Sequence, residues 1–249
     1  MTTELRPHQI ARWAVRLLAV VMIPVILFVT WNQMNHNFGQ VQPGRIYRSG
    51  QMSSGALAHA VRNNRIKTVL NLRGSNLGRS WYRDELTTTL SAGATHIDIA
   101  MSSCLWMSRI QLRALVDTLD TAECPILIHC AWGSERTGLA AAFAELLRPG
   151  STLDDARAQF TVWYLFVPVG DGKVMAEHLD LYESWLRQER VEHTPASFRL
   201  WAHSGFQPRH PSREDWRHDP PPPAVIRRPD SSPQPEPVAS GVSASPAWK

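Results

Sequence analysis

One string in the second half of the chain, HCAWGSERTG from His129 to Gly138, combines residue types that can do chemistry together. Cys130 is followed six positions later by Arg136, with a short apolar run before the cysteine and an apolar helical pattern after the arginine. A loop between a strand end and a helix N-terminus aims backbone N–H groups and the helix dipole at one point, which favours a bound anion. The same field lowers the pKa of a thiol, so the string predicts a thiolate nucleophile beside an anion.

The other residues of the string have separate physical tasks. Arg136 offers a planar fork that can hold two phosphate oxygens, and Gly133 permits a backbone conformation that a side chain would resist. Thr137 places a hydroxyl within reach of the sulfur, His129 is expected to stiffen the loop, and Trp132 is expected at the pocket entrance. The predicted phosphate-binding residues are Ala131, Trp132, Gly133, Ser134, Glu135, Arg136 and Thr137.

The string resembles the active-site loop of the cysteine-dependent protein tyrosine phosphatase superfamily. It is similar in particular to the compact dual-specificity-like phosphatases of bacteria. Two upstream segments, GRIYRSGQ (44–51) and IKTVLNLRG (66–74), and the strand before the loop occur in the same order in that group. The resemblance therefore extends over about residues 43–190.

This resemblance implies a mechanism and a substrate class. Cys130 would be the nucleophile that becomes a cysteinyl phosphate, Arg136 would bind the phosphate, and Thr137 would assist hydrolysis of the intermediate. The expected reaction is hydrolysis of a phosphomonoester on a protein (phosphotyrosine or phosphoserine) or on a phosphorylated lipid or inositol. We expect no cofactor and no metal, and the three cysteines of the chain show no metal-ligand spacing.

The general acid of this chemistry is not obvious in the sequence. The superfamily normally carries an aspartate on a loop after the preceding strand, but here Met101–Ser103 holds no acid. Asp98 is the nearest candidate, and Glu135 inside the loop is the second, with the alternative role of a carboxylate favoured at a helix start. The missing acid leaves a second function open, a pseudophosphatase-type module that binds phosphorylated partners without turnover.

Charge is unevenly distributed along the chain. Residues 43–83 hold eight cationic side chains and no acid, which suits an anionic substrate or a surface paired with acids elsewhere. Within this region, Arg48 and Arg73 could line the pocket mouth or serve as structural ion-pair residues. Asp84 and Glu85 are predicted to be surface charges of a helix. The net charge of +4 gives no case for a nucleic-acid partner.

From residue 44 onward, strand patterns alternate with helix patterns. This alternation predicts an α/β fold with a central, mostly parallel sheet flanked by helices. The expected strands are 44–50, 66–72, 95–99 and 125–129, and the expected helices are 53–64, 80–93, 108–119, 137–147, 153–166 and 174–190.

The N-terminal segment has the features of a transmembrane helix. Residues 13–31 contain a single charge, Arg16, and as a helix they would span roughly 27 Å, close to the hydrocarbon thickness of a bilayer. Three arginines precede the apolar run, and the next basic residue is Arg45, which predicts a cytoplasmic N-terminus. We expect a single span of the cell inner membrane with a periplasmic or extracytoplasmic catalytic domain. A cleaved signal peptide is the alternative, although a small-x-small cleavage site is missing.

The composition changes again after Ala202. Eleven of the eighteen prolines lie in residues 203–249, which predicts a disordered Pro-rich tail. The sequence therefore divides into three parts: a cytoplasmic tip, transmembrane helix and linker (1–42), a phosphatase domain (43–202) and a tail (203–249).

Overall fold

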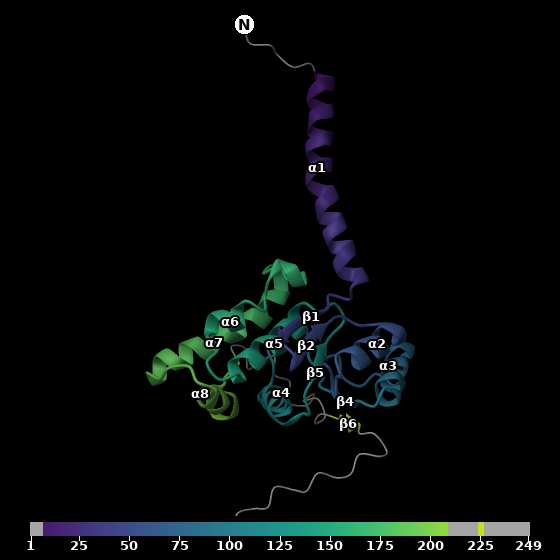
Figure 1. Cartoon of the computed structure of the whole chain (residues 1–249). Coiled ribbons are helices and arrows are strands. Elements are labelled where there is room, and N and C mark those ends of the chain that lie inside the picture. Colours follow the sequence, from purple (N-terminus) through teal and green to yellow (C-terminus); the bar gives the residue numbers. More distant parts are fainter. Residues whose placement is uncertain (1–6, 209–223, 227–249) are drawn as a thin grey trace, which may run out of the picture.

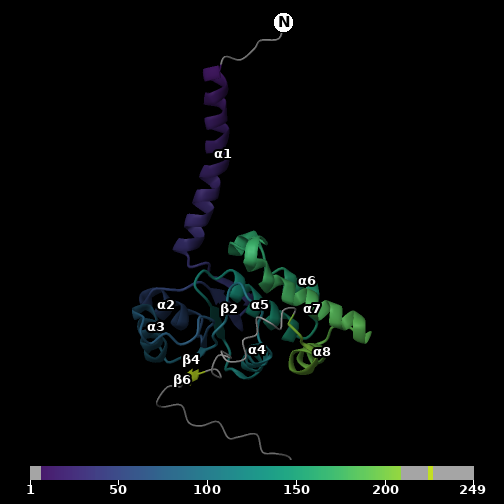
Figure 2. The same cartoon turned by 180° about the vertical axis from the view of Figure 1, so that it is seen from behind.

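The computed structural model of the chain describes residues 7–208 and 224–226. A long helix, α1 (Pro7–Met34), projects from a domain that is formed by the rest of the described chain. In this domain a mixed sheet lies between layers of helices, as Figures 1 and 2 show from opposite sides. The predicted α/β class, with helices flanking the sheet, is confirmed.

The sheet has the strand order β1-β2-β5-β3-β4-β6 in the part of the chain that the structure describes. The four central strands are parallel, and each outer strand is antiparallel to its neighbour. Ser49, His129, Asn71 and Asp98 end the four parallel strands at the same level. Side chains and loops at these carboxyl ends therefore meet at one edge of the sheet, where open α/β sheets bind ligands. The strands are β1 (Gly39–Gln42), β2 (Ile46–Ser49), β3 (Thr68–Asn71), β4 (Thr95–Asp98), β5 (Ile126–His129) and β6 (Ala224–Ile226).

Helices cover both faces of the sheet because alternate strand residues point to opposite sides. Ile126 and Ile128 belong to the larger core with α4, α5, α7 and α8, whereas Leu127 packs in a smaller core with α2. Helix α3 completes the smaller layer by packing against α2 and β4. The helices of the domain are α2 (Ser54–Asn63), α3 (Ser80–Ser91), α4 (Arg109–Thr121), α5 (Glu135–Leu147), α6 (Leu153–Arg157), α7 (Val174–Glu189) and α8 (Pro195–Leu200).

One predicted helix, 153–166, is much shorter in the structure. Helix α6 ends at Arg157, and a 3₁₀ turn, η1 (Val162–Tyr164), follows after extended backbone. Leu165 then takes a left-handed conformation with φ 58°, and Phe160 packs against Phe166 with ring centroids 4.9 Å apart. The expected helix is wrong because burying this aromatic pair requires the chain to turn back on itself.

The structure also differs from the expected boundary of the tail. Phe206, which lies beyond the expected boundary at residue 202, is buried in the core directly after a π-helical turn, η3 (Trp201–Gly205). Further along, β6 pairs with β4 through Ala224–Ile226, so this part of the predicted tail is a strand. The remaining tail residues, 209–223 and 227–249, and the N-terminal tip, 1–6, lie outside the described residues.

Candidate active site

The predicted strand, loop and helix are present around Cys130. Strand β5 ends at His129 and α5 begins at Glu135, so the string connects the carboxyl end of a central strand to a helix N-terminus. The Cys130 side chain is buried, and its sulfur accepts a hydrogen bond from the Gly133 backbone N–H at 3.3 Å. The sulfur therefore lies beneath a loop whose backbone turns around it.

Opposing influences act on the Cys130 thiol. Burial raises its pKa, but the charge of Arg136 and hydrogen bonds from Thr137 and Gly133 lower it, and the result is a pKa below the ordinary value. The Thr137 hydroxyl also faces the Ser49 carbonyl at 3.5 Å, the outer limit of a hydrogen bond. A thiolate is the stronger acceptor of that single proton, so Thr137 favours the ionised form.

The Arg136 guanidinium is only partly satisfied by the protein. Its Nη1 donates to the Met101 carbonyl at 3.2 Å, whereas its buried Nε has no hydrogen-bond partner among the described residues. A buried N–H without an acceptor costs free energy. A phosphate held in the loop would supply the missing acceptor, so the residues present fit an oxyanion.

Backbone contacts fix the shape of the loop. Gly133 has φ +73°, and a Cβ atom there would lie 2.6 Å from the Gly50 nitrogen and 2.7 Å from the Ser49 carbonyl carbon. Both the left-handed conformation and the close approach require glycine at this position. The loop is therefore locked against the end of β2.

Arg48 holds the loop from behind. Its Nη2 donates to the Gly133 carbonyl at 2.9 Å, its Nη1 donates to the Gln159 carbonyl at 2.8 Å, and its guanidinium lies 3.7 Å from the Tyr164 ring centroid. Burial lowers the pKa of Arg48 to about 10, against the raising influence of Tyr164 and Cys130. The two expected roles of Arg48, lining the pocket mouth or pairing with an acid, are both wrong within the described residues. Arg48 instead contacts two backbone carbonyls, the Gln159 side-chain oxygen and the Tyr164 ring.

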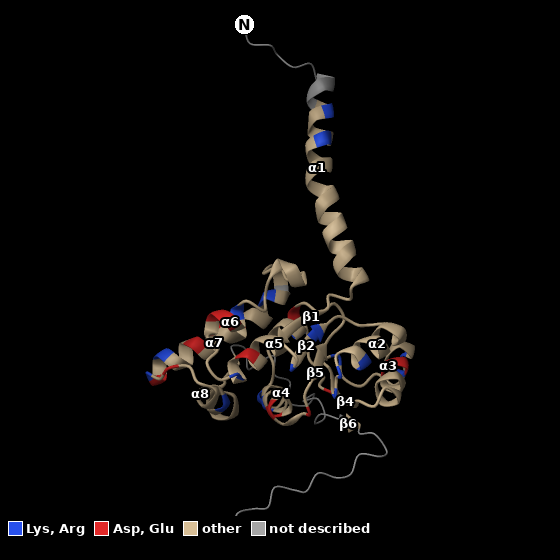
Figure 3. Ribbon diagram, in the orientation of Figure 1, with Lys and Arg blue, Asp and Glu red and all other residues tan. Residues whose placement is uncertain are grey.

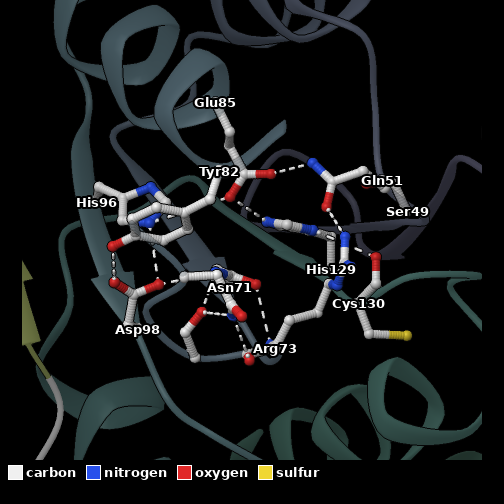
Figure 4. Close-up of polar contacts among 12 residues, drawn as sticks. Ser49, Gln51, Asn71, Arg73, Tyr82, Glu85, His96, Asp98, His129 and Cys130 are labelled. Atoms are coloured by element: carbon white, nitrogen blue, oxygen red, sulfur yellow. Dashed lines mark hydrogen bonds and ion pairs between the residues drawn. The ribbon is translucent and has the colours of Figure 1, made fainter. Parts of the chain in front are cut away.

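A buried polar network supports His129. Its Nε2 lies 3.1 Å from Glu85 Oε1, Glu85 accepts a second hydrogen bond from the Gln51 amide, and Gln51 Oε1 accepts from Arg73 Nη1 at 2.7 Å (Figure 4). Burial lowers the pKa of His129, but the Glu85 carboxylate raises it by more, so the net shift is upward. The expected stiffening of the loop by His129 has a physical basis in this pairing.

The prediction that Glu85 is a surface charge is wrong, because its side chain is only 3% exposed. Tyr82, Glu85 and Thr89 are the buried residues of α3, and their spacing puts them on the one face that packs inward. Asp84, one residue away, is exposed as predicted. The spacing of Tyr82 and Thr89 around Glu85 was the available signal in the sequence.

Asp98 lies at the other end of the network. Its carboxylate accepts hydrogen bonds from the Tyr82 hydroxyl and from Asn71 Nδ2 at 2.7 Å, and it lies 3.1 Å from His96 Nε2. Burial raises the pKa of Asp98, but these three partners lower it below its ordinary value. Figure 4 shows the Cys130 sulfur pointing away from this cluster. The structure does not bring Asp98 to the loop.

Glu135 is the candidate acid that does lie on the loop. It is the first residue of α5, it is half-buried, and its side chain makes no hydrogen bond or ion pair within the described residues. Its Cγ approaches the backbone of Gly172, where an added Cβ atom would lie 3.3 Å away. Of the other loop residues, the Trp132 indole is exposed, as expected for the pocket entrance, and the Ser134 hydroxyl is buried without a partner among the described residues.

Arg73 is a second guanidinium close to the loop. Its pKa is lowered by burial and by Arg136, and raised by Glu85 and Cys130, so it lies within electrostatic reach of both predicted catalytic residues. The guanidinium stacks on Trp81, 3.4 Å from the ring centroid, which holds it in place. The site therefore offers two guanidinium groups to an anion. Figure 3 shows how the arginines and lysines are distributed over the described chain.

Comparisons with known proteins find similarity over the same region of the chain. Residues 33–148 match the model of the tyrosine phosphatase family. No curated relative matches the chain. Similar solved structures include TpbA of P. aeruginosa, which is 18% identical with a TM-score of 0.48, over 67% of this chain and 90% of that one. The core catalytic domain of the PP-IP phosphatase SIW14 from S. cerevisiae is 20% identical with a TM-score of 0.46, over 62% and 92% of the two chains.

The family match contains the loop with Cys130 and Arg136 and both of the upstream segments, 44–51 and 66–74. Over residues 33–148 the chain therefore matches the tyrosine phosphatase family, and this match supports a phosphatase that hydrolyses phosphomonoesters.

Proposed function

We propose that the chain is a membrane-anchored, cysteine-dependent phosphatase that hydrolyses phosphomonoesters through a cysteinyl phosphate on Cys130. The observation that carries this proposal is the buried sulfur, whose pKa is lowered despite burial by Arg136 and by the loop donors. The unpaired Nε of Arg136 supports it, because this N–H is aimed at no protein acceptor in the described chain. The substrate classes remain those expected above, a phosphorylated protein or a phosphorylated lipid or inositol.

The proposed reaction has two displacements at phosphorus. The Cys130 thiolate attacks the phosphorus atom, the bond to the ester oxygen breaks, and that oxygen takes a proton from a general acid. Arg136 holds two non-bridging oxygens in both transition states. A water molecule then attacks the cysteinyl phosphate and loses a proton to the same group, and the sulfur–phosphorus bond breaks. Thr137 donates its hydroxyl proton to the sulfur as a hydrogen bond, which stabilises the departing thiolate.

Glu135 is our choice for the general acid. Asp98 uses its carboxylate for three partners in a buried cluster and has a lowered pKa, so it is a poor proton donor in this arrangement. Glu135 lies on the loop itself, and its carboxyl group has no competing partner among the described residues.

The experiment that tests the function compares the full chain in detergent with Cys130→Ser. We expect the parent to hydrolyse an aryl phosphate and, after rapid quenching, to carry one added phosphoryl group in its intact mass. Cys130→Ser should lose both properties while still binding inorganic phosphate. Unchanged turnover by Cys130→Ser would overturn the proposal.

The alternative, a module that binds phosphate without turnover, is favoured by one observation, the engagement of Asp98 away from the loop. Saturable binding of phosphate by the parent with no hydrolysis and no phosphoryl adduct would support that alternative.

A further inference from the structure

A group of exposed apolar side chains lies on the domain close to α1 and takes no part in the proposed chemistry. Val162, Trp163, Val167 and Val169 are 61%, 70%, 56% and 67% exposed. They belong to residues 162–169, which we call the apolar loop and which include the turn η1. Single exposed apolar residues are ordinary, but four within eight positions of one loop are a concentration of the kind that marks an interaction surface.

The apolar loop touches α1 within its apolar stretch. The Trp163 ring packs edge-to-face on Phe28, with ring centroids 5.6 Å apart. Phe28 lies inside Ala11–Met34, the one helical stretch of the described chain that is long and apolar enough to cross a membrane. Trp31, which is exposed, lies three residues nearer the domain, so the contact of Trp163 is with a residue about 4.5 Å further along the helix than Trp31. If α1 crosses a bilayer, Trp163 lies at the depth of its last apolar turns.

The composition of this region fits a lipid surface. From Ala158 to Gly170 the chain reads AQFTVWYLFVPVG and carries no charge. Tryptophan is enriched where protein meets the headgroup region, and a short apolar segment can lie in that layer without spanning it. In Figures 1 and 2, the green segment between α6 and α7 is the part of the domain that rises highest beside α1.

The apolar loop is connected rigidly to α1 and to the catalytic loop. The buried Asn37, three residues after the end of α1, donates to the Tyr164 carbonyl at 2.9 Å and to the Trp132 carbonyl at 3.0 Å. Gly39 lies against the Tyr164 ring, where a Cβ atom would be 2.5 Å from the hydroxyl oxygen. Because one side chain bonds the two loops, the position of the apolar loop at a membrane fixes that of the catalytic loop.

We propose that the apolar loop is a membrane-docking surface, which inserts Trp163 and the neighbouring valines into the lipid interface beside α1. The partner is the lipid of the membrane that α1 spans, so the inference rests on the anchoring part of the proposed function. Docking holds the domain at one tilt, with the Trp132 side of the catalytic loop near the bilayer. The chain is thereby held by two contacts, a spanning helix and an inserted loop.

The test uses the full chain in vesicles of phosphatidylcholine and phosphatidylglycerol, with the three native cysteines changed to serine. One cysteine at a time then replaces Val167, Ile23 or Leu200 and carries a nitroxide label. Leu200 on α8 is the matched control, because it is as exposed as Val167 but lies on the part of the domain remote from α1 in both views. Collision rates with oxygen and with a water-soluble nickel complex report the depth of each label, and thermal unfolding checks that each variant is folded.

We expect the ratio of oxygen to nickel collision rates to be several-fold higher for the labels at Val167 and Ile23 than for the label at Leu200. If the label at Val167 is in water while the label at Ile23 is in lipid, docking is overturned but the membrane span of α1 is supported. Aqueous labels at both positions would overturn the anchor and docking together. Neither result bears on the chemistry of Cys130, which the serine variant above tests separately.

Discussion

Cys130 owes its low pKa to a small number of specific groups rather than to solvent. Burial alone would keep the thiol protonated, so the ionised form depends on the Arg136 charge and on hydrogen bonds from Thr137 and Gly133. Charge and fork geometry are separable contributions of Arg136, because lysine keeps the first and loses the second.

The pH dependence of thiol alkylation should follow this balance. In a Cys104→Ser, Cys124→Ser background, inactivation by iodoacetamide should rise with a midpoint below the ordinary thiol pKa of about 8.5. Arg136→Met should move that midpoint upward, since the opposing charge is lost. Arg136→Lys should leave it close to the parent value and still lower turnover about tenfold or more by removing the paired hydrogen bonds. Equal midpoints in the parent and Arg136→Met would contradict the electrostatic account.

The general acid can be identified from how each variant's turnover depends on the pKa of the leaving group. Glu135→Gln should lower kcat for an alkyl phosphate by about 10²–10⁴-fold, because an alkoxide needs a proton to leave. The same variant should hydrolyse an aryl phosphate with a low leaving-group pKa at close to the parent rate. Asp98→Asn is the comparison, and its effect on both substrates should be equal. A selective loss with Asp98→Asn instead would assign the proton to Asp98.

At the scale of elements, the site is made by the β5–α5 connection pressed against the end of β2. Gly133 and Gly50 approach each other so closely that the two loops act as one unit, with Arg48 fastened behind them. The same sheet edge brings β3 and α3 to the site, and through them Arg73 and Glu85.

Gly133→Ala should disrupt this contact. The substitution combines a left-handed conformation with a methyl group placed against Gly50, so we expect a loss of about 1–3 kcal/mol in unfolding free energy and near-complete loss of phosphatase activity. Thermal unfolding and aryl phosphate hydrolysis measure the two effects. Gly55→Ala is the matched control, since a Cβ at Gly55 in α2 meets nothing within 4 Å, and its stability should stay within about 1 kcal/mol of the parent.

The pairing of Glu85 with His129 should make stability depend on pH. Burial raises the pKa of Glu85, but His129 lowers it by more, and the net shift is downward. The contribution of Glu85 to folding stability is therefore present above the ordinary glutamate pKa and is lost as pH falls through the lowered pKa. The pKa of His129 is raised, so its contribution to folding stability is lost as pH rises through that raised pKa. Glu85→Gln should cost about 3–5 kcal/mol between these limits and less outside them. Asp84→Asn, its exposed neighbour, should change stability by less than about 0.5 kcal/mol at any pH. A pH-independent cost of Glu85→Gln would contradict this pairing.

The sequence predicts the loop well and the network poorly for one physical reason. The groups that lower the pKa of Cys130 lie within seven consecutive residues, so strand, turn and helix patterns are enough to place Cys130 and Arg136 together. Glu85, Gln51 and His129 come from three separate segments, and only the register of the parallel strands brings them into contact. The early end of α6 at Arg157 is not predicted for a similar reason, since packing of Phe160 against Phe166 overrides local helix propensity.

At the scale of the whole molecule, the proposed membrane span of α1 has an orientation, and that orientation would decide which substrates the domain can meet. A C-terminal fusion to a reporter that is active only outside the cytoplasm should be active, because the arginines lie before the apolar stretch and retain the N-terminus inside. The intact mass of the purified chain should include residues 1–34. Activity of a cytoplasm-only reporter would reverse the topology, and a chain shortened near residue 34 would support a cleaved signal peptide.

The pairing of Ala224–Ile226 with β4 has a consequence for solubility. A terminal strand of a sheet presents a row of unpaired N–H and C=O groups, which is a template for pairing with another molecule. Here β6 occupies that row along His96–Asp98. A chain cut before residue 224 would leave the row bare, and sedimentation should then show dimers and larger aggregates that the full chain does not form.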